Sequence, residues 1–108
     1  TVPVDTGIMI GKIVTANSTP ELRDRYIITS NPEFLAEGSA INDLMKPDRV
    51  VIGCQDENAE IGKFLNLYHY AADKIIRTNS SSSELSKLVA NCFLAQRVSS
   101  INSIAILC

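Results

Sequence analysis

Lys46-Pro47-Asp48-Arg49-Val50-Val51-Ile52-Gly53 is the stretch that decides the fold class of this 108-residue chain. Its first three residues have the composition of a turn, and the β-branched run that follows them predicts a strand. Two similar runs flank it, at residues 26–29 and 74–78. Because segments with helical spacing separate the three predicted strands, we expect an α/β layer, one half of a doubly wound parallel sheet.

Helices are predicted between and beyond these strands. Thr6 is placed to cap a helix that runs to about Asn17, with a buried apolar stripe. The stripe consists of Ile8, Met9, Ile13 and Val14. Shorter helices are expected at residues 39–44 and 56–70, the second from its apolar spacing.

The longest predicted helix covers residues 83–108, which contain neither Gly nor Pro. Small and apolar side chains recur there at steps of three and four residues. A helix of that length would extend on the order of 39 Å. Such a length is unusual inside a small domain, so it favours a connector or the interface of a homo-oligomer.

Composition excludes several classes of protein. Hydrophobic residues make up 45% and charged residues 20%, which favours a folded core over disorder. The net charge of −2 argues against a nucleic-acid binder, and no apolar run reaches the roughly 18 residues of a membrane span. The beginning has no signal-peptide pattern, and both ends are expected to be cuts in a longer sequence.

The cysteines and the histidine predict neither a disulfide framework nor a metal site. Cys54, Cys92 and Cys108 are far apart and lack CxxC spacing, so we expect reduced thiols that serve packing in a cytoplasmic protein. His69 is the only histidine, which provides neither a zinc site nor a catalytic dyad.

Two groups of polar residues are candidates for chemistry. Glu33 and Glu37 follow a predicted strand, so they are expected at the carboxyl edge of a parallel sheet, where α/β proteins bind ligands. They are either an acid/base or hydroxyl-binding pair, or solvated loop charges. Glu84, Lys87 and Asn91 share a helix face. That face is either an exposed polar stripe with a weak ion pair, or a cation and an amide that meet a polar substrate.

Three longer motifs add a family resemblance. Thr1-Val2-Pro3-Val4, residues 30–38 (Ser-Asn-Pro-Glu-Phe-Leu-Ala-Glu-Gly) and residues 82–102 occur here in a fixed order. In that order they resemble the UDP-glucose 6-dehydrogenases of the UDP-glucose/GDP-mannose dehydrogenase family. Ala36 and Gln96 resemble the animal type more than the bacterial type.

The resemblance implies an internal piece of an NAD-dependent enzyme that oxidises UDP-glucose to UDP-glucuronate. Residues 1–80 would be the second half of a Rossmann-like NAD-binding domain. Residues 81–108 would begin the family's long central helix, which joins subunits. UDP-glucose and NAD are the ligands that the resemblance implies, with no metal.

The resemblance also implies roles for single residues. Glu33 would handle protons and activate water, which requires partial burial to raise its pKa toward neutrality. Lys87 would stabilise the oxyanion of the tetrahedral species, and Asn91 would hydrogen-bond the same centre. The substrate contacts would be Glu33, Phe34, Leu35, Ala36, Glu37, Lys87 and Asn91, and the cofactor contacts Thr1, Val2 and Glu37.

Two parts of the family's catalytic apparatus are absent from these 108 residues. There is no Gly-rich phosphate loop and no Gly-Gly-Ser-Cys nucleophile motif. Gly53-Cys54-Gln55-Asp56 is only a superficial echo of that motif, because it directly follows a strand. We therefore expect no turnover from this chain alone. The alternatives are an inactive paralogue that acts as a binding or dimerisation module, and an unrelated α/β binding domain.

Overall fold

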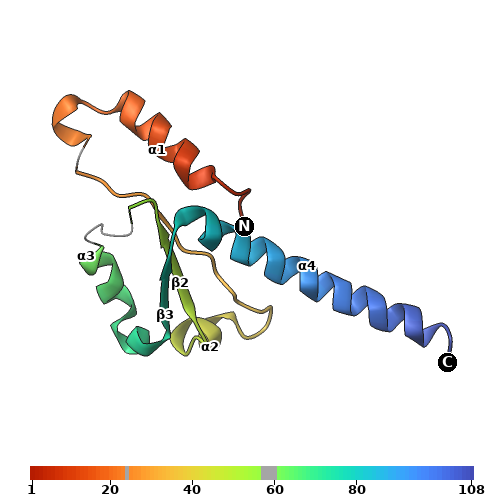
Figure 1. The fold of residues 1–108 in the computed structure, drawn as a ribbon. Coiled ribbons are helices and arrows are strands. Elements are labelled where there is room, and N and C mark those ends of the chain that lie inside the picture. The colour runs from red at the N-terminus through yellow and green to blue at the C-terminus, as the bar shows by residue number, and fades with distance from the viewer. Residues whose placement is uncertain (24, 57–60) are drawn as a thin grey trace.

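The computed structural model describes residues 1–23, 25–56 and 61–108. It has the α/β fold expected from the sequence (Figure 1). The elements in chain order are α1 (Thr6–Asn17), η1 (Pro20–Leu22), β1 (Thr29–Ser30), α2 (Ala40–Met45), β2 (Val50–Cys54), α3 (Gly62–Leu65), η2 (Asn66–Lys74), β3 (Ile75–Thr78) and α4 (Ser80–Ala105).

The sheet has the order β1-β2-β3, and it is mixed rather than fully parallel. β2 and β3 pair in parallel, but β1 pairs antiparallel to β2 through Thr29 opposite Cys54 and Ser30 opposite Gly53. The expectation of a wholly parallel sheet is therefore wrong at β1. A parallel crossover needs a long connection. The only helix between β1 and β2 is α2, whose six residues rise about 9 Å and do not carry the chain back across the sheet.

β1 is shorter and later than the strand predicted at residues 26–29. Pairing explains the difference, because β2 ends at Cys54, directly opposite Thr29. Residues 26–28 therefore run past the end of β2. These residues keep an extended backbone, as their β-branched composition favours, but they have no hydrogen-bonded partner in β2.

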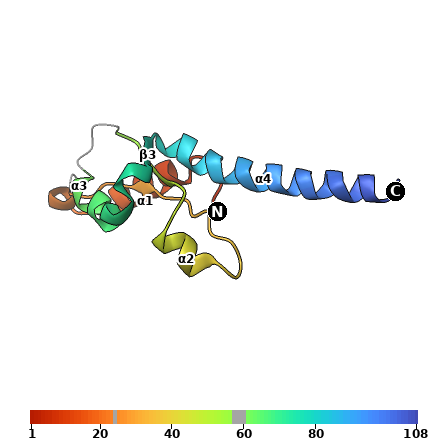
Figure 2. The same ribbon diagram turned by 90° about the horizontal axis from the view of Figure 1, so that it is seen from below.

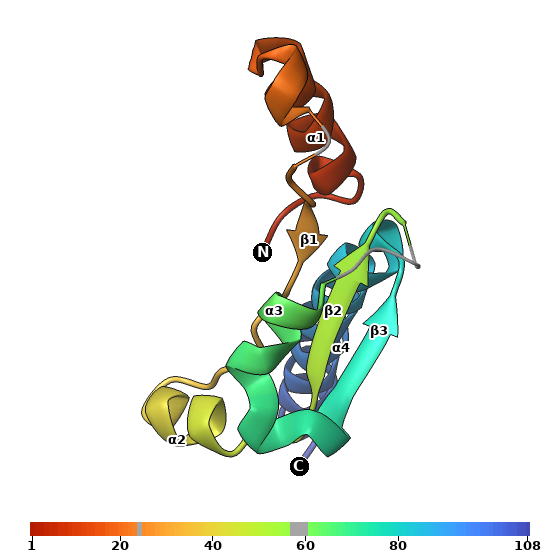
Figure 3. The ribbon, with the colours of Figure 1, turned by 90° about the vertical axis from the view of Figure 1, so that its left-hand side faces the viewer.

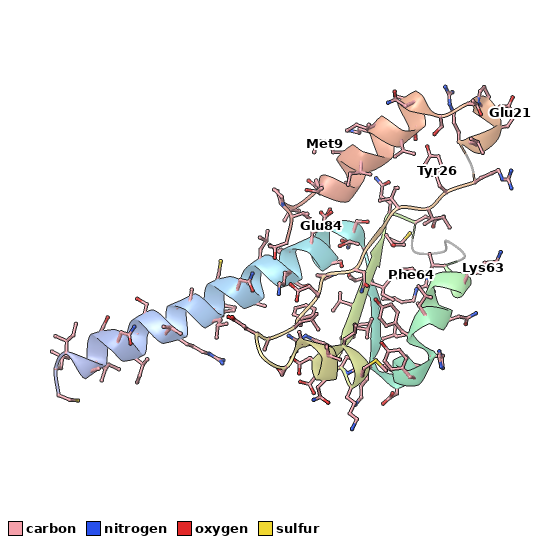
Figure 4. The ribbon with its side chains drawn as sticks, turned by 180° about the vertical axis from the view of Figure 1, so that it is seen from behind. Met9, Glu21, Tyr26, Lys63, Phe64 and Glu84 are labelled. Atoms are coloured by element: carbon pink, nitrogen blue, oxygen red, sulfur yellow. The ribbon has the colours of Figure 1, made fainter. Side chains whose placement is uncertain are left out.

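The core lies on the face of β2 that meets α3 and η2. Val50, Ile52 and Cys54 alternate along β2 toward this face, where Ile61 and Ala71 complete a buried cluster. Phe64 packs against this cluster from α3, while Lys63 points outward (Figure 4). α4 begins on the opposite side of the sheet, so the body has three layers (Figure 3).

The contact between β2 and α4 is unusually close at Gly53. A Cβ atom at that position would lie 2.4 Å from Ser83 Cβ, 2.8 Å from the Asn79 carbonyl oxygen and 3.0 Å from Ser80 Cα. Only a residue without a side chain fits there. Gly53 therefore sets how near the first turn of α4 comes to the sheet.

α1 matches its predicted bounds, but its packing differs from the prediction. Gly7 is its only buried residue, and Met9 and Ile13 are 57% and 55% exposed. The expected buried stripe is therefore wrong for these two side chains. Thr6 is not the cap either, since it lies inside the helix and its hydroxyl donates to the Pro3 carbonyl at 2.6 Å.

The helix predicted at residues 56–70 is only partly present. Residues 57–60 lie outside the described ranges, and α3 begins at Gly62. From Asn66 to Lys74 the chain is a 3-10 helix with non-helical backbone angles at Tyr68 and Ala71. Apolar spacing detects the buried side chains but does not distinguish a continuous α-helix from this kinked form.

α4 starts three residues earlier than residue 83 and ends at Ala105. The Asn79 side chain accepts a hydrogen bond from Ser82 N at 2.8 Å, so Asn79 is the N-cap. α4 extends well beyond the three-layer body, and the molecule measures 66 × 31 × 22 Å (Figure 2). No helix within the described ranges is both long and apolar enough to cross a membrane.

Candidate functional site

The loop that follows β1 is fixed at its start by one asparagine. Asn31 Nδ2 donates to the Val51 carbonyl at 2.9 Å, and Tyr68 Oη donates to Asn31 Oδ1 at 2.5 Å. These bonds attach the loop to β2 and to η2. Because β1 is antiparallel, the loop lies where β2 begins, not at the carboxyl edge that the sequence predicted. The sequence does not predict that Asn31 and Tyr68 position this loop, since the partner of each hydrogen bond is distant in the sequence.

The far end of the loop is held by α2. Asp43 Oδ2 accepts hydrogen bonds from Ala36 N at 3.1 Å and from Ser39 Oγ at 2.7 Å. Both bonds lower the pKa of Asp43, the one from Ser39 more than the one from Ala36. The loop and α2 border a cleft of about 530 Å³ whose lining includes Glu33, Phe34 and Tyr68. The candidate loop is thus held at both ends.

Glu33 and Lys87 form the centre of the candidate site. Lys87 Nζ lies 3.1 Å from Glu33 Oε1, and the lysine side chain is 11% exposed against 54% for Glu33. The other carboxylate oxygen, Oε2, accepts from Leu35 N at 2.8 Å. The two residues are far apart in sequence, so the fold brings together two side chains that were predicted to act on one reaction.

Phe34 lies beneath two cations. Arg49 Cζ is 4.3 Å from the centre of its ring, and Lys87 Nζ is 5.5 Å from it. Both distances are within the range of cation–π attraction. The ring face and the Glu33 carboxylate therefore both attract the Lys87 ammonium group, at a position with little access to water.

The pKa of Glu33 is lowered from its ordinary value of 4.5. The main cause is the hydrogen bond from the Leu35 amide, followed by the hydrogen bond from Lys87. The condition that burial raises this pKa toward neutrality is therefore not met in this structure. Glu33 is therefore ionised at neutral pH, which suits an anion that holds Lys87 in place. The same lowered pKa makes Glu33 a weak base.

The remaining predicted site residues lie around this centre and are open to solvent. Asn91 is on α4 one turn after Lys87, and it is exposed. Glu37, Thr1 and Val2 are exposed as well. The structure therefore places Glu33, Phe34 and Lys87 in contact. The other six predicted site residues are exposed positions in the loop, on α4 or on the N-terminal segment: Leu35, Ala36, Glu37, Asn91, Thr1 and Val2.

Glu84 does not belong to the polar stripe in which the sequence placed it. It is only 3% exposed. Its carboxylate accepts hydrogen bonds from Asp5 N at 2.6 Å and from Gly7 N at 2.7 Å, at the beginning of α1. Figure 4 shows Glu84 between the first turn of α1 and the first turns of α4. Nothing in the local sequence pattern indicates this contact, because its two partners lie more than seventy residues away.

The three cysteines are free thiols. Cys54 is buried in β2, in agreement with a packing role, and its Sγ lies 3.8 Å from the Ile28 carbonyl. Cys92 and Cys108 are exposed, so the packing role expected for these two thiols is wrong. Across residues 1–23, 25–56 and 61–108, no three His, Cys, Asp or Glu side chains gather as metal ligands would.

Taken together, the layered fold and the polar loop beside its sheet define a class, the α/β ligand-binding domains. Comparison with known proteins narrows the class. The family model described as "UDP-glucose/GDP-mannose dehydrogenase family, NAD binding domain" matches residues 1–72. This chain belongs to that family, as the three sequence motifs indicated.

Named relatives agree with this assignment. The chain is 53% identical over 114 residues to the UDP-glucose 6-dehydrogenase of Mus musculus, covering all of this chain and 22% of that protein. It is 51% identical over 113 residues to UDP-glucose 6-dehydrogenase 3 of Oryza sativa, covering all of this chain and 23% of that protein. The expected likeness to animal proteins is confirmed, and a plant protein is nearly as similar. The chain thus spans less than a quarter of the length of these relatives.

A solved structure also resembles this fold. It is a UDP-glucose dehydrogenase from the archaeon Pyrobaculum islandicum, with a TM-score of 0.62 and 42% sequence identity. The alignment covers 72% of this chain and 18% of the archaeal chain. The likeness supports a Rossmann-like α/β domain of the dehydrogenase type.

Proposed function

We propose that these 108 residues form the substrate-facing part of an NAD-dependent UDP-glucose 6-dehydrogenase, which converts UDP-glucose to UDP-glucuronate. The observation that carries the proposal is the ion pair between Lys87 and Glu33, 3.1 Å apart beside the Phe34 ring. The names of the relatives supply the substrate and the dehydrogenation, and the product is the one that the family resemblance implies. The catalytic roles belong to Glu33, Lys87 and Asn91, and Phe34, Leu35, Ala36 and Glu37 join them as substrate contacts.

Lys87 supports oxidation of a bound alcohol by electrostatics. A cation held in a place with little water stabilises negative charge on a substrate oxygen more strongly than a solvated cation would. Glu33 keeps the ammonium group in position through the 3.1 Å contact, and the Phe34 ring faces the same cation. Asn91, one turn further along α4, offers an amide to the same polar ligand.

The residues present offer NAD only part of a site. Thr1, Val2 and Glu37 are exposed and are our candidates for contacts with it. The sequence contains no Gly-x-Gly-x-x-Gly loop, which in dinucleotide-binding domains receives the pyrophosphate. NAD, when bound, would be the hydride acceptor.

A second function is supported by a different observation, the exposed apolar surface of α4. Phe93, Leu94, Val98, Ile101 and Ile104 are all more than half exposed. We propose that this surface joins identical subunits in the cytoplasm. A copy of the chain without turnover would then act as a dimerisation module.

A chimeric enzyme tests the proposed dehydrogenase function. Residues 1–108 replace the matching segment of the Mus musculus UDP-glucose 6-dehydrogenase, and NADH formation from UDP-glucose is followed by absorbance. We expect turnover by the chimera and none by the 108-residue chain alone. The unaltered mouse enzyme is the positive control, and omission of UDP-glucose gives the background rate. A folded chimera that forms no NADH would refute the proposal.

A further inference from the structure

α1 is held to the rest of the molecule with little help from apolar packing. Gly7 is its only buried residue, and Met9, Ile10 and Ile13 are between 43% and 57% exposed. Figure 4 shows Met9 on the open side of the helix. Burial of apolar area is the usual source of helix attachment, so another interaction has to fix where α1 begins.

Glu84 provides that interaction. Its two carboxylate oxygens accept from two backbone amides, Asp5 N at 2.6 Å and Gly7 N at 2.7 Å. The first amides of a helix have no partner within the helix, and its N-terminus carries partial positive charge. A carboxylate at this place is stabilised by both effects. Its burial, with 3% exposure, is compensated by these charge-assisted bonds.

The backbone around Glu84 is shaped to bring both amides to one carboxylate. Asp5 has φ of +71°, in the left-handed region that non-glycine residues seldom adopt. Ser81 Oγ donates to Asp5 Oδ1 at 2.5 Å, which ties this turn to α4 a second time. A Cβ atom on Gly7 would lie 3.2 Å from Glu84 Oε1, so the glycine leaves room for the approach.

We propose that Glu84 is a positioning residue that fixes residues 1–5 and the start of α1 to the helix that carries Lys87. Glu84 and Lys87 are three residues apart on α4, less than one helical turn. Lys87 contacts Glu33 in the candidate loop at 3.1 Å. Two adjacent turns of α4 therefore hold both the N-terminal segment and the loop. Because Thr1 and Val2 lie in the segment that Glu84 holds, Glu84 would also affect the binding of NAD. This consequence rests on the proposed function.

Hydrogen exchange in the full 108-residue chain tests the proposal with Glu84→Gln. Glutamine has nearly the same size, but its NH₂ group cannot accept from an amide, so at least one of the two bonds is lost. We expect the two amides at Asp5 and Gly7 to exchange about tenfold faster or more, in a peptide covering residues 1–10 measured by mass spectrometry. The peptide covering residues 50–54 serves as a reference and should change by less than about twofold.

Two further variants sharpen the result. Glu21→Gln makes the same chemical change at an exposed carboxylate on η1, and exchange in both peptides should stay as in the unaltered chain. Ser81→Ala removes only the bond to Asp5, so acceleration should be smaller and confined to the first peptide. Unchanged exchange at residues 1–10 in Glu84→Gln would overturn the proposal. Equal acceleration in both peptides would overturn it too, since Glu84 would then support the whole core.

The chimeric enzyme separates this proposal from the proposed function. There, Glu84→Gln should raise KM for NAD more than KM for UDP-glucose, because the segment with Thr1 and Val2 is released while the Glu33 loop stays in place. Equal changes in both constants would overturn the link to the cofactor. An unaltered chimera without activity would count against the proposed function alone, and the exchange experiment would still decide the role of Glu84.

Discussion

Lys87 has much less access to water than Glu33, its partner in the candidate site. It is 11% exposed, and its charge is balanced by the Glu33 carboxylate at 3.1 Å and by the face of the Phe34 ring. A charge at such a position destabilises the fold once its partner is removed. Glu33 and Lys87 therefore depend on each other both in the folded protein and in the proposed chemistry.

Substitution of either partner should reduce the turnover of the chimeric enzyme. We expect Lys87→Ala and Glu33→Gln each to lower kcat by about 100-fold or more, because the first removes the cation that stabilises the oxyanion and the second removes the carboxylate that holds that cation in place. Lys74→Ala and Glu21→Gln are matched controls at exposed positions and should stay within about twofold of the unaltered chimera. Steady-state NADH formation measures all four. A Lys87→Ala or Glu33→Gln rate close to these controls would remove that residue from the site.

The ionisation of Glu33 should be visible in the chain by itself. Its pKa is lowered from 4.5, first by the Leu35 amide and then by Lys87. A lowered folded-state pKa means that the contribution of this carboxylate to stability is complete above 4.5 and is lost as the pH falls through the folded value. NMR titration should place the Glu33 pKa below 4.5, and Lys87→Met should raise it. A value above 4.5 in the unaltered chain would show that the Leu35 and Lys87 contacts do not form in solution.

Single residues also show where sequence reasoning succeeds and where it stops. Family motifs placed Glu33 and Lys87 in one site, and the structure brings them into contact. Helical spacing groups Glu84 with Lys87, three residues away, on a face that is predicted to be either an exposed polar stripe or a surface that meets a polar substrate. Local spacing contains no information on partners more than seventy residues away, and those partners, Asp5 and Gly7, decide what Glu84 does.

At the scale of elements, the packing of α4 on β2 depends on Gly53. We expect Gly53→Ala to lower the free energy of unfolding by about 1–3 kcal/mol, because the new Cβ would lie 2.4 Å from Ser83 Cβ and close to backbone atoms. Gly62→Ala is the matched control, since it meets no atom within 4 Å and lies in α3, where alanine favours the helix. Urea unfolding followed by circular dichroism compares the two. A Gly53→Ala chain as stable as the Gly62→Ala chain would contradict the close contact.

The elements themselves were predictable to different degrees. β2, β3 and α1 follow from β-branched runs and from helical spacing, and their bounds agree well with prediction. The direction of β1 and the kinked 3-10 form of η2 were not predicted. Strand direction depends on where the connecting chain returns, and the kink depends on how Tyr68 and Ala71 pack. Local periodicity of the sequence predicts neither the strand direction nor the kink.

At the scale of the whole molecule, α4 extends far beyond the three-layer body and is apolar where it does so. Every residue from position 91 to 108 is exposed. Leu94, Val98 and Ile101 follow one another at steps of four and three residues, so they form one stripe along the helix. An isolated helix with such a stripe is unstable in water unless another surface covers it, and a second copy of the same helix is self-complementary.

The chain should therefore self-associate through this stripe. We expect the unaltered chain to form dimers or larger species by size-exclusion chromatography with light scattering, and the double variant Leu94→Lys and Ile101→Lys to be monomeric. The control, Ser99→Lys and Ser103→Lys, adds the same charge to the opposite side of α4 and should leave association unchanged. If the control dissociates as readily as the stripe variant, net charge rather than the stripe governs association. A monomeric unaltered chain would mean that α4 keeps its apolar surface open to water without a partner, which contradicts the proposed subunit interface.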